Sequence, residues 1–471
     1  MSYLSSGRPA ASRSLKGPLR EFPGKKGTHN TTDMNTSPKP SLFPVLLVNF
    51  IGMLGYSIII PLLVYLVRDF GGNAFMYGLL GSVYPGFQLI GAPILGRWSD
   101  QLGRRRVLLL SQAGTFLAWL LFIGALLTPP RQLLQVPLGP ENVFLLTLPL
   151  LLLFVARAFD GLTGGNISVA NAYLSDVSTD ENRKANFGKM ASSTSLGFII
   201  GPAVASMLSG TALGVLLPVM TAALVSLIAI AVIYKYLPES RPQAVANNLP
   251  RLRVKKLFSV EIKECYTRQN CPDLRFTGIL RLPHVSFLYS VYFLTFLGFS
   301  FFYAGFPIYA SGQLNWAPAR LGTFFTVSSL VMVVFQGPVL TYLSSRVSDA
   351  LLVSVGSVLI AANFFLLTLG TDEWVFTAVV LMAIGNGLMW PSFLAVLSRS
   401  GTPGIQGTIQ GYANSVGSAA SILGLVLGGW LMGRLGPVVF WVSGTLFVLI
   451  FLVSFYLSRV ENQLRAIPAV G

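Results

Sequence analysis

Charged residues, cysteine and histidine are all scarce in this chain. Only 11% of its 471 residues are charged and 53% are hydrophobic, with a mean hydropathy of +0.66. Soluble domains hold about 25% charged residues, so this composition excludes an ordinary soluble protein. Its two cysteines, Cys265 and Cys271, lack the further ligands that a structural zinc site needs, and we expect them to be reduced thiols. The composition indicates a polytopic membrane protein.

Long apolar runs recur along the chain after residue 41. About 20 apolar residues cross a bilayer as a helix, and a helix satisfies its own backbone hydrogen bonds in lipid. We therefore predict an all-α polytopic membrane protein of twelve transmembrane helices. The expected spans are Leu42–Val67, Met76–Gly96, Val107–Leu127, Leu146–Tyr173, Phe187–Ser209, Leu213–Tyr236, Val285–Ala310, Leu321–Leu343, Ala350–Leu369, Trp374–Leu397, Tyr412–Met432 and Val438–Leu457.

Lys and Arg gather in alternate loops, and cytoplasmic loops are the ones that carry an excess of them. One side holds the basic first 41 residues and the linker after the sixth span, whereas the other holds only Arg68, Arg131, Arg320 and Arg434. We therefore expect both termini in the cytoplasm and the protein in the cell (inner) membrane. The net charge of +16 reflects this topology and attraction to anionic lipid. Its dispersal over separate loops argues against a nucleic-acid partner.

The chain divides into five predicted parts, because a polar, basic linker separates six spans from six. These are a disordered basic cytoplasmic tail (1–41), a six-helix bundle (42–236), the cytoplasmic linker (237–283), a second six-helix bundle (284–459) and a C-terminal tail (460–471). A shift of 223 residues pairs Leu174 with Leu397 and Gly201 with Gly424. We interpret this as a parallel repeat, with chance matching of common residues as the alternative. Two such halves, related by a pseudo-two-fold axis, can rock about a central cavity.

A short charged loop, LGRWSDQLGRRR, follows the second predicted span. Its pattern resembles the G-x-x-x-D-x-x-G-R-[KR] signature of the major facilitator superfamily, and the surrounding sequence is similar to the tetracycline-efflux branch of the 12-helix drug/proton antiporters. The resemblance implies a cytoplasmic gate, in which an acid beside arginines faces a helix N-terminus of the other half. For Asp100 we favour this gate over a role as topology anchor. The implied gating residues are Gly96, Asp100, Gly103, Arg104 and Arg105.

Two further motifs resemble the same superfamily. Arg157 and Gly161 fit its fourth-helix R-x-x-x-G motif. Gly197, Gly201 and Pro202 fit the fifth-helix G-x-x-x-G-P motif of antiporters. Proline kinks a helix, and the family reading is that this kink seals the outward cavity against proton leak. Small residues four apart also permit close helix packing, and we hold both explanations.

The fourth predicted span holds Arg157 and Asp160, three residues apart and hence on one helix face. An isolated charge at mid-bilayer costs about 2.5–3.5 kcal/mol, so neither side chain should face lipid. Asp160 is the one acid near the centre of a predicted span, and proton transport needs a titratable group. We predict that Asp160, with Arg157 beside it, couples transport to protons. The alternative is a static ion pair that orders the bundle.

Tetracycline-efflux proteins carry an acid in the first helix and a histidine in the eighth. This chain has Gly52 and Met332 at those positions, with the neutral Asn49 one turn before the first. Its two histidines, His29 and His284, fall outside the predicted spans. These differences weaken the prediction that tetracycline itself is the substrate, and a different coupling scheme or facilitated diffusion stays open.

The predicted spans carry aromatic and neutral polar residues that suit a substrate cavity poor in fixed charge. We expect a small amphiphilic organic substrate, with protons and membrane lipid as the other partners of a monomer. No cofactor, metal or catalytic residue is predicted, and no phosphate-binding loop indicates ATP as the driving force. The candidate substrate-binding residues are Tyr56, Gln88, Asn166, Tyr292, Tyr303, Gln336, Asn363, Asn386 and Trp390.

The sequence thus predicts a secondary transporter that works by alternating access, as a proton-coupled exporter of multidrug or tetracycline type. One alternative is a transporter of an endogenous metabolite or lipid, either proton-coupled or a uniporter. The other is a membrane receptor or sensor that keeps the fold and does not transport.

Overall fold

A computed structural model describes residues 42–137, 143–164, 166–240, 276–400 and 406–466. The predicted basic tail, most of the predicted linker and both cysteines lie outside these residues. Residues up to 240 form what we call the first half. Its helices are α1 (Phe43–Ile59), α2 (Leu63–Asp69), α3 (Ala74–Leu102), α4 (Arg104–Leu127), α5 (Leu148–Thr163), α6 (Asn166–Val177), α7 (Asp180–Ser209) and α8 (Leu216–Tyr236).

The second half comprises the described residues from 276 onward. It contains a π-helical turn, η4, and a 3-10 turn, η5, beside its α-helices. Its elements are α9 (Phe276–Ile279), α10 (Val285–Gly312), α11 (Pro318–Val334), η4 (Phe335–Val339), α12 (Leu340–Ser344), α13 (Asp349–Leu367), α14 (Asp372–Arg399), α15 (Gln406–Leu435), η5 (Gly436–Val438) and α16 (Val439–Ala466).

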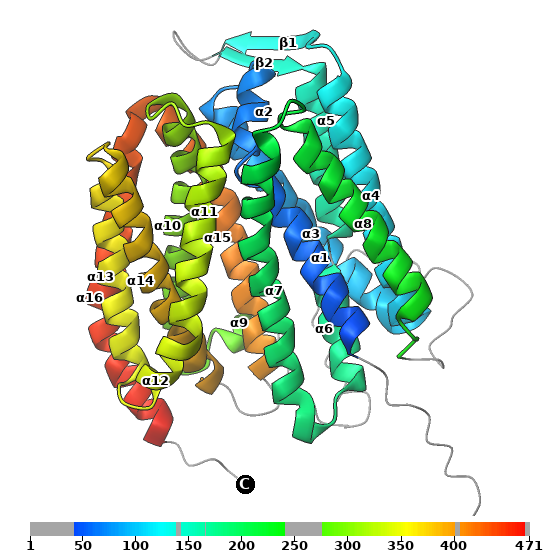
Figure 1. Cartoon of the computed structure of the whole chain (residues 1–471). Coiled ribbons are helices and arrows are strands. Elements are labelled where there is room, and N and C mark those ends of the chain that lie inside the picture. The colour runs from blue at the N-terminus through cyan, green and yellow to red at the C-terminus, as the bar shows by residue number, and fades with distance from the viewer. Residues whose placement is uncertain (1–41, 138–142, 165, 241–275, 401–405, 467–471) are drawn as a thin grey trace, which may run out of the picture. The chain divides into compact units, whose positions relative to one another are not determined.

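The predicted fold class, an all-α polytopic membrane protein, is confirmed. By length and composition the described helices give ten candidate spans, or eleven when α1 and α2, bent by 42° at their break, count as one. The stretch Ile409–Leu464 is 56 residues long, far more than the roughly 20 that cross a bilayer. It breaks at Gly436, where φ is +58°, into α15 and α16, which Figure 1 draws as two separate helices. Divided there, the described helices reach the predicted twelve.

A two-stranded antiparallel sheet, which the sequence does not predict, lies between α4 and α5. It pairs β1 (Gln132–Pro137) with β2 (Val143–Thr147). The Thr147 hydroxyl donates to the Phe70 carbonyl and fixes the sheet to the end of α2. Figure 1 shows the sheet and α2 at one end of the molecule, which we call the hairpin end. The opposite end, where α4 begins, is the Arg104 end.

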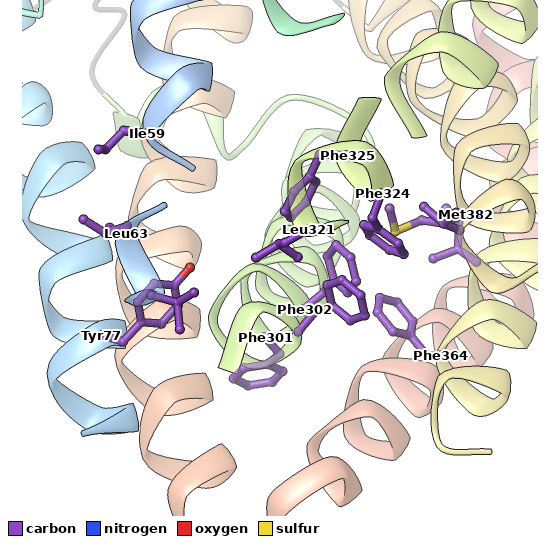
Figure 2. Packing of buried hydrophobic residues seen from close by; sticks show 14 of the residues in the cluster. Ile59, Leu63, Tyr77, Phe301, Phe302, Leu321, Phe324, Phe325, Phe364 and Met382 are labelled. Atoms are coloured by element: carbon purple, nitrogen blue, oxygen red, sulfur yellow. The ribbon is translucent and has the colours of Figure 1, made fainter. Parts of the chain in front are cut away.

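The largest hydrophobic cluster includes residues of both halves. Phe302 of α10, Phe324 of α11 and Phe364 of α13 are fully buried, and the Phe302 ring contacts the other two. Figure 2 shows these rings beside Met382, with Ile59, Leu63 and Tyr77 of the first half across from them. Phe306 stacks on Phe324 with ring centroids 4.2 Å apart. Aromatic packing therefore holds α10, α11, α13 and α14 together as a unit.

Spacing between α3 of the first half and α15 of the second increases from the hairpin end toward the Arg104 end. A Cβ added at Gly78 would lie 3.0 Å from the Cα of Gly429, whereas one added at Gly86 would lie 3.9 Å from the nearest side-chain atom of Ile422. One added at Gly96 would meet nothing within 4 Å. The two helices therefore converge at the hairpin end.

The second pair of helices between the halves, α7 and α11, follows the same pattern. At the hairpin end, the Ser206 hydroxyl donates to the Ala319 carbonyl at 2.6 Å, and a Cβ at Gly322 would lie 2.8 Å from the Pro202 carbonyl oxygen. A Cβ added at Gly188, near the Arg104 end, would meet nothing within 4 Å. The two halves therefore meet at the hairpin end and separate toward the Arg104 end.

Gly91 lies where α3 crosses α5, and an added Cβ would come within 2.8 Å of the Leu162 Cα. We expect Gly91→Val to destabilise the first half by about 1–3 kcal/mol, because overpacking forces backbone shifts. Thermal unfolding in detergent measures this loss. The matched control is Gly124→Val in α4, because a Cβ there meets nothing within 4 Å. Equal midpoints for the two variants would contradict the close crossing.

Candidate functional site

A cavity of about 240 Å³ lies inside the first half. Its lining residues belong to α1, α3, α4, α6 and α8 and to the end of α5. Aliphatic and aromatic side chains form much of the wall, so the polar groups stand out. These are Asn49, Tyr56, Tyr84, Gln88, Gln112, Thr115, Asp160 and Ser226.

Asp160 is the acid of this cavity, and only 7% of its surface is exposed. Its carboxylate lies 3.6 Å from Nη1 of Arg157 and accepts a hydrogen bond from the Thr115 hydroxyl. The Arg157 guanidinium, also buried, lies over the rings of Tyr84 and Tyr56, 4.7 Å and 5.8 Å from their centroids. The structure therefore places the predicted coupling pair together, away from lipid, among aromatic rings.

The glycine of the predicted fourth-helix motif makes this arrangement sterically possible. A Cβ at Gly161 would lie 2.9 Å from that of Phe87 and 3.2 Å from the Tyr84 Cα. This close crossing of α5 and α3 brings Tyr84 beside Arg157. Gln88, one turn along α3, donates from its amide to the Tyr84 hydroxyl at 3.2 Å and to the Gly164 carbonyl at 3.0 Å.

Arg104, from the predicted gating loop, is the centre of a polar cluster at the Arg104 end. Its buried guanidinium binds the carboxylates of Asp100 at 2.5 Å and Asp176 at 2.9 Å. The Glu239 carboxylate accepts from the backbone amides of Arg104 and Arg105 and so caps α4. Asp100 itself is 41% exposed. The ion pair of Asp100 with Arg104 thus lies within the first half.

Gly103 is the single residue between α3 and α4. Its φ is +95°, a backbone conformation that favours glycine. A Cβ there would also come within 2.8 Å of the Glu239 carboxyl carbon. Glycine in the motif therefore lets the capping carboxylate approach α4. At Gly96 an added Cβ meets nothing within 4 Å, so the structure gives no packing reason for that glycine.

The second half repeats this cluster with the charges exchanged. Asp349, the first residue of α13, accepts from Nη1 of Arg399 at 2.7 Å. Glu461 accepts from the backbone amides of Asp349 and Ala350, as Glu239 does at α4. Arg399 lies 223 residues after Asp176, the shift of the predicted repeat. Each half therefore has such an ion pair, with acid and base exchanged. Asp349 lies 245 residues after Arg104, so the shift matches for one partner only, and the repeat stays a prediction.

Because the two clusters match, the pair in the second half should tolerate reversal. We expect Asp349→Arg alone to cost about 2 kcal/mol, less than the 3–5 kcal/mol of a fully buried pair, since Arg399 is 40% exposed. Combining it with Arg399→Asp should recover most of that loss. Thermal unfolding of the two single variants and the double variant measures the coupling. A double variant as unstable as the worse single variant would contradict the repeat.

Gly197 and Gly201 of the predicted antiporter motif face α1. A Cβ at Gly197 would lie 2.7 Å from that of Met53, and the Ser57 hydroxyl donates to the Gly197 carbonyl at 2.8 Å. Pro202, inside α7, places its carbonyl against Gly322 of the second half. The motif thus packs α7 against both halves, which supports the packing explanation. The seal against proton leak stays a prediction.

An aromatic cluster in the second half holds two predicted substrate residues. Tyr292 of α10 and Trp390 of α14 contact edge to face, 5.1 Å between centroids, and both contact Phe296. The Tyr292 hydroxyl donates to Oδ1 of Asn414 at 2.9 Å. Tyr292 is buried and Trp390 is half-buried. The structure brings these two together and places them on helices different from those of the cavity.

The remaining predicted substrate residues are scattered. The Tyr303 carbonyl, in α10, accepts from the Tyr77 hydroxyl; Gln336 lies in η4, and Asn386 donates to the Met332 sulfur at 3.2 Å. The Asn363 amide is fully buried and donates to the Ala378 carbonyl at 2.9 Å. Asn166 begins α6, and its side chain lies outside the described part of the structure. Of the nine predicted residues, Tyr56 and Gln88 line the cavity.

Gly52 and Asn49 lie at and near the position where tetracycline-efflux proteins carry their first-helix acid. The Asn49 amide in α1 donates to the hydroxyls of Ser193 at 2.7 Å and Thr194 at 2.8 Å. It therefore links α1 to α7. Gly52 lines the cavity. His284 lies just before α10 with a φ of +64°.

Sequence reasoning missed Gln112, Thr115 and Ser226 of the cavity and Tyr84 beside Arg157. Gln112 and Thr115 are three apart on α4 and so share a face. That spacing of polar residues in an apolar span is the signal that could have found them. Tyr84 had no such signal, because its position depends on the crossing of α3 and α5.

At the hairpin end, α2 binds the last turn of α10 and the loop after it. The Tyr65 hydroxyl donates to the Trp316 carbonyl at 2.6 Å, and Nη1 of Arg68 donates to the Ser311 carbonyl at 3.2 Å. Asp372 fixes Trp316 in turn, because it accepts from the indole nitrogen at 2.9 Å. We call the two bonds of Tyr65 and Arg68 the hairpin-end latch. It joins the halves where they converge.

Comparison with known proteins identifies this architecture. The sequence profile described as Major Facilitator Superfamily matches residues 45–425 and 288–469. The chain belongs to the Major Facilitator Superfamily. As a member of the superfamily it is a multi-pass integral membrane protein and a secondary transporter, not an enzyme. Members of the superfamily bind small-molecule substrates, as predicted.

Relatives in the superfamily confirm the predicted resemblance to tetracycline-efflux proteins. The chain is 25% identical to the class D tetracycline resistance protein of Salmonella ordonez, over 83% of this chain and 88% of that protein. It is also 25% identical to major facilitator superfamily domain-containing protein 10 of Mus musculus, over 91% of this chain and 97% of that protein.

Solved structures share the fold. That of the human organic anion transporter MFSD10 has a TM-score of 0.60 at 20% identity and covers 88% of this chain and 98% of its own. The structure of a D-xylose-proton symporter has a TM-score of 0.66 at 14% identity and covers 88% of this chain and 97% of its own.

Proposed function

We propose that this transporter exports small amphiphilic organic compounds in exchange for protons, and that Asp160 is the residue that takes up and releases the proton. The observation that carries the proposal is the position of Asp160, buried in a cavity beside Arg157 and bonded to Thr115. A carboxylic acid there can be charged or neutral without facing lipid. Proton binding would weaken its attraction to Arg157 and so change the fit of α5 against α3 and α4.

The arrangement of the halves supports alternating access. The halves converge at the hairpin end and separate toward the Arg104 end, as one of the two states of such a cycle requires. We propose that the Arg104 end faces the cytoplasm, because described basic residues such as Arg104, Arg105 and Lys235 lie there. In this orientation the state is open to the cytoplasm. The gate of Asp100 against the second half would form in the opposite state.

The substrate is proposed to lie between the halves, in contact with the aromatic cluster of Tyr292, Phe296 and Trp390. These rings offer apolar and stacking surface, and Asn414 adds a neutral polar group. Such a surface suits a planar, amphiphilic molecule. Similarity to proteins named for tetracycline resistance supports the proposal that the chain exports compounds of this kind.

An organic anion is a second candidate substrate. One solved relative is named as an organic anion transporter, and Nε and Nη1 of the buried Arg157 lack a hydrogen-bond partner in the described structure. A carboxylate or phosphate group would supply such partners. This candidate fits the alternative of an endogenous metabolite, which the sequence left open.

Flux in proteoliposomes tests the proposal. The purified chain is reconstituted, a pH gradient is imposed, and accumulation of amphiphilic cationic, neutral and anionic dyes is followed. Accumulation that collapses when an ionophore removes the gradient is expected for a proton-coupled exporter. Equal movement with and without the gradient would support a uniporter, and binding without movement would support a receptor.

A further inference from the structure

The cavity in the first half extends away from the second half. Its lining includes Gln112 of α4 and Ser226 of α8. These two helices pack against each other, and α4 also packs against α5 and α8 against α1. The lining residues come from the first half alone. Asp160 therefore faces a space that is separate from the aromatic cluster of the second half.

Gln112 is a buried polar group with an unmet hydrogen bond. Its side chain is 1% exposed, and its Nε2 donates to the Ser226 hydroxyl at 2.6 Å. Its Oε1 has no partner in the described structure. Buried acceptors are nearly always satisfied, so a donor is expected at this oxygen. Thr115, which donates to Asp160, lies one turn along the same face of α4.

The cavity has room for that donor to be water. A water occupies about 30 Å³ in the liquid, so about 240 Å³ accommodates several. Water also needs two to four polar partners, which Gln112, Thr115, Ser226 and Asp160 provide. The Arg157 and Asp160 side chains are 3.6 Å apart, too far for a direct hydrogen bond, and Nε and Nη1 of Arg157 lack a hydrogen-bond partner in the described structure, so they can also bind water.

We propose that this cavity is a water-filled proton site, in which Gln112 orders water that leads to the Asp160 carboxylate. Protons then reach Asp160 through the interior of the first half, apart from the substrate between the halves. The groups that face Asp160 are Arg157, Thr115, Tyr84 and Tyr56. The proposal rests on proton coupling at Asp160, and Gln112 acts as a positioning residue.

Hydroxyl-radical footprinting with mass spectrometry tests for the water directly. Met53 and Trp119 line the cavity and are 8% and 3% exposed, so rapid labelling of them reports internal water. The controls are Met382 and Trp316 of the second half, 5% and 3% exposed. We expect labelling of Met53 and Trp119 to exceed that of these controls several-fold. Labelling as slow as the controls in the unmodified chain would overturn the proposal, whatever the role of Asp160.

Transport by Gln112 variants tests what the water does. Gln112→Leu should slow uptake driven by a pH gradient roughly ten-fold, because the water that carries the proton to Asp160 is no longer held in place. Substrate exchange without a gradient should stay within about two-fold of the unmodified rate. Gln112→Asn keeps an amide and should restore most of the driven rate. If Gln112→Leu loses driven transport and exchange equally, its role is structural and the proposal fails. If Asp160→Asn transports uphill normally although the cavity is labelled, the proposed coupling fails and the water remains.

Discussion

Asp160→Asn abolishes uphill transport driven by a pH gradient, while exchange of substrate across the membrane survives. The amide keeps the size of the carboxyl and can still accept from Thr115, but it cannot bind and release a proton. We expect the driven rate to fall by a factor of about 100 or more, because proton transfer by a positioned side chain contributes that much. The measurement is dye accumulation in proteoliposomes with an imposed gradient, beside counterflow exchange with none.

The matched control for this result is Glu373→Gln, which changes an exposed acid in the first turn of α14. Its uphill transport should equal that of the unmodified chain. Asp160→Glu adds a useful comparison, because it retains an acid one methylene longer. Uphill transport by Asp160→Asn at the unmodified rate would remove Asp160 from coupling. Loss of exchange together with uphill transport would favour the static ion pair.

Removing the hairpin-end latch shifts the protein toward the state in which the hairpin end is open. The double variant Tyr65→Phe with Arg68→Ala loses two hydrogen bonds between the halves, one from a charged group. Together these contribute about 2–4 kcal/mol, and 1.4 kcal/mol is a factor of ten in an equilibrium constant. We therefore expect the ratio of the two states to change by a factor of about 30 or more.

Electron spin resonance distances measure this shift. Spin labels at Leu213 and Leu369, exposed residues near the hairpin end of each half, should give a short distance in the unmodified chain and a longer one in the double variant. Cys265 and Cys271 must first be replaced so that they do not take up label. Tyr342→Phe, which removes an exposed phenol on α12, serves as control. An unchanged distance distribution in the double variant would show that the latch does not hold the halves together.

Sequence patterns were sufficient for the helices and for the burial of Arg157 beside Asp160. Apolar runs of span length are a strong signal, and Arg157 and Asp160 are conspicuous because charges inside a span are costly. The bend between α1 and α2 and the β-hairpin were not predicted, since both depend on contacts such as that of Thr147 with Phe70. The fold was thus largely within reach of the sequence.

The cavity was only partly predictable. Gln112 and Tyr84 are ordinary residues of apolar helices, and their roles follow from helix crossings that one sequence does not reveal. Asn363, by contrast, has the polarity expected of a binding residue but is fully buried and bonded to Ala378. Polarity inside a span therefore identifies residues that need partners, and the packing decides whether the partner is protein, water or substrate.

The ion pairs described above each close within one half: Arg104 with Asp100 and Asp176, Arg157 with Asp160, and Arg399 with Asp349. When the halves swing apart at the hairpin end, these opposite charges stay together. The interactions that must break there are packing between small residues and bonds to neutral carbonyls. Apart from the Arg68 bond of the latch, the described contacts that close the hairpin end are between uncharged groups, so we expect added salt to change the rate of switching little.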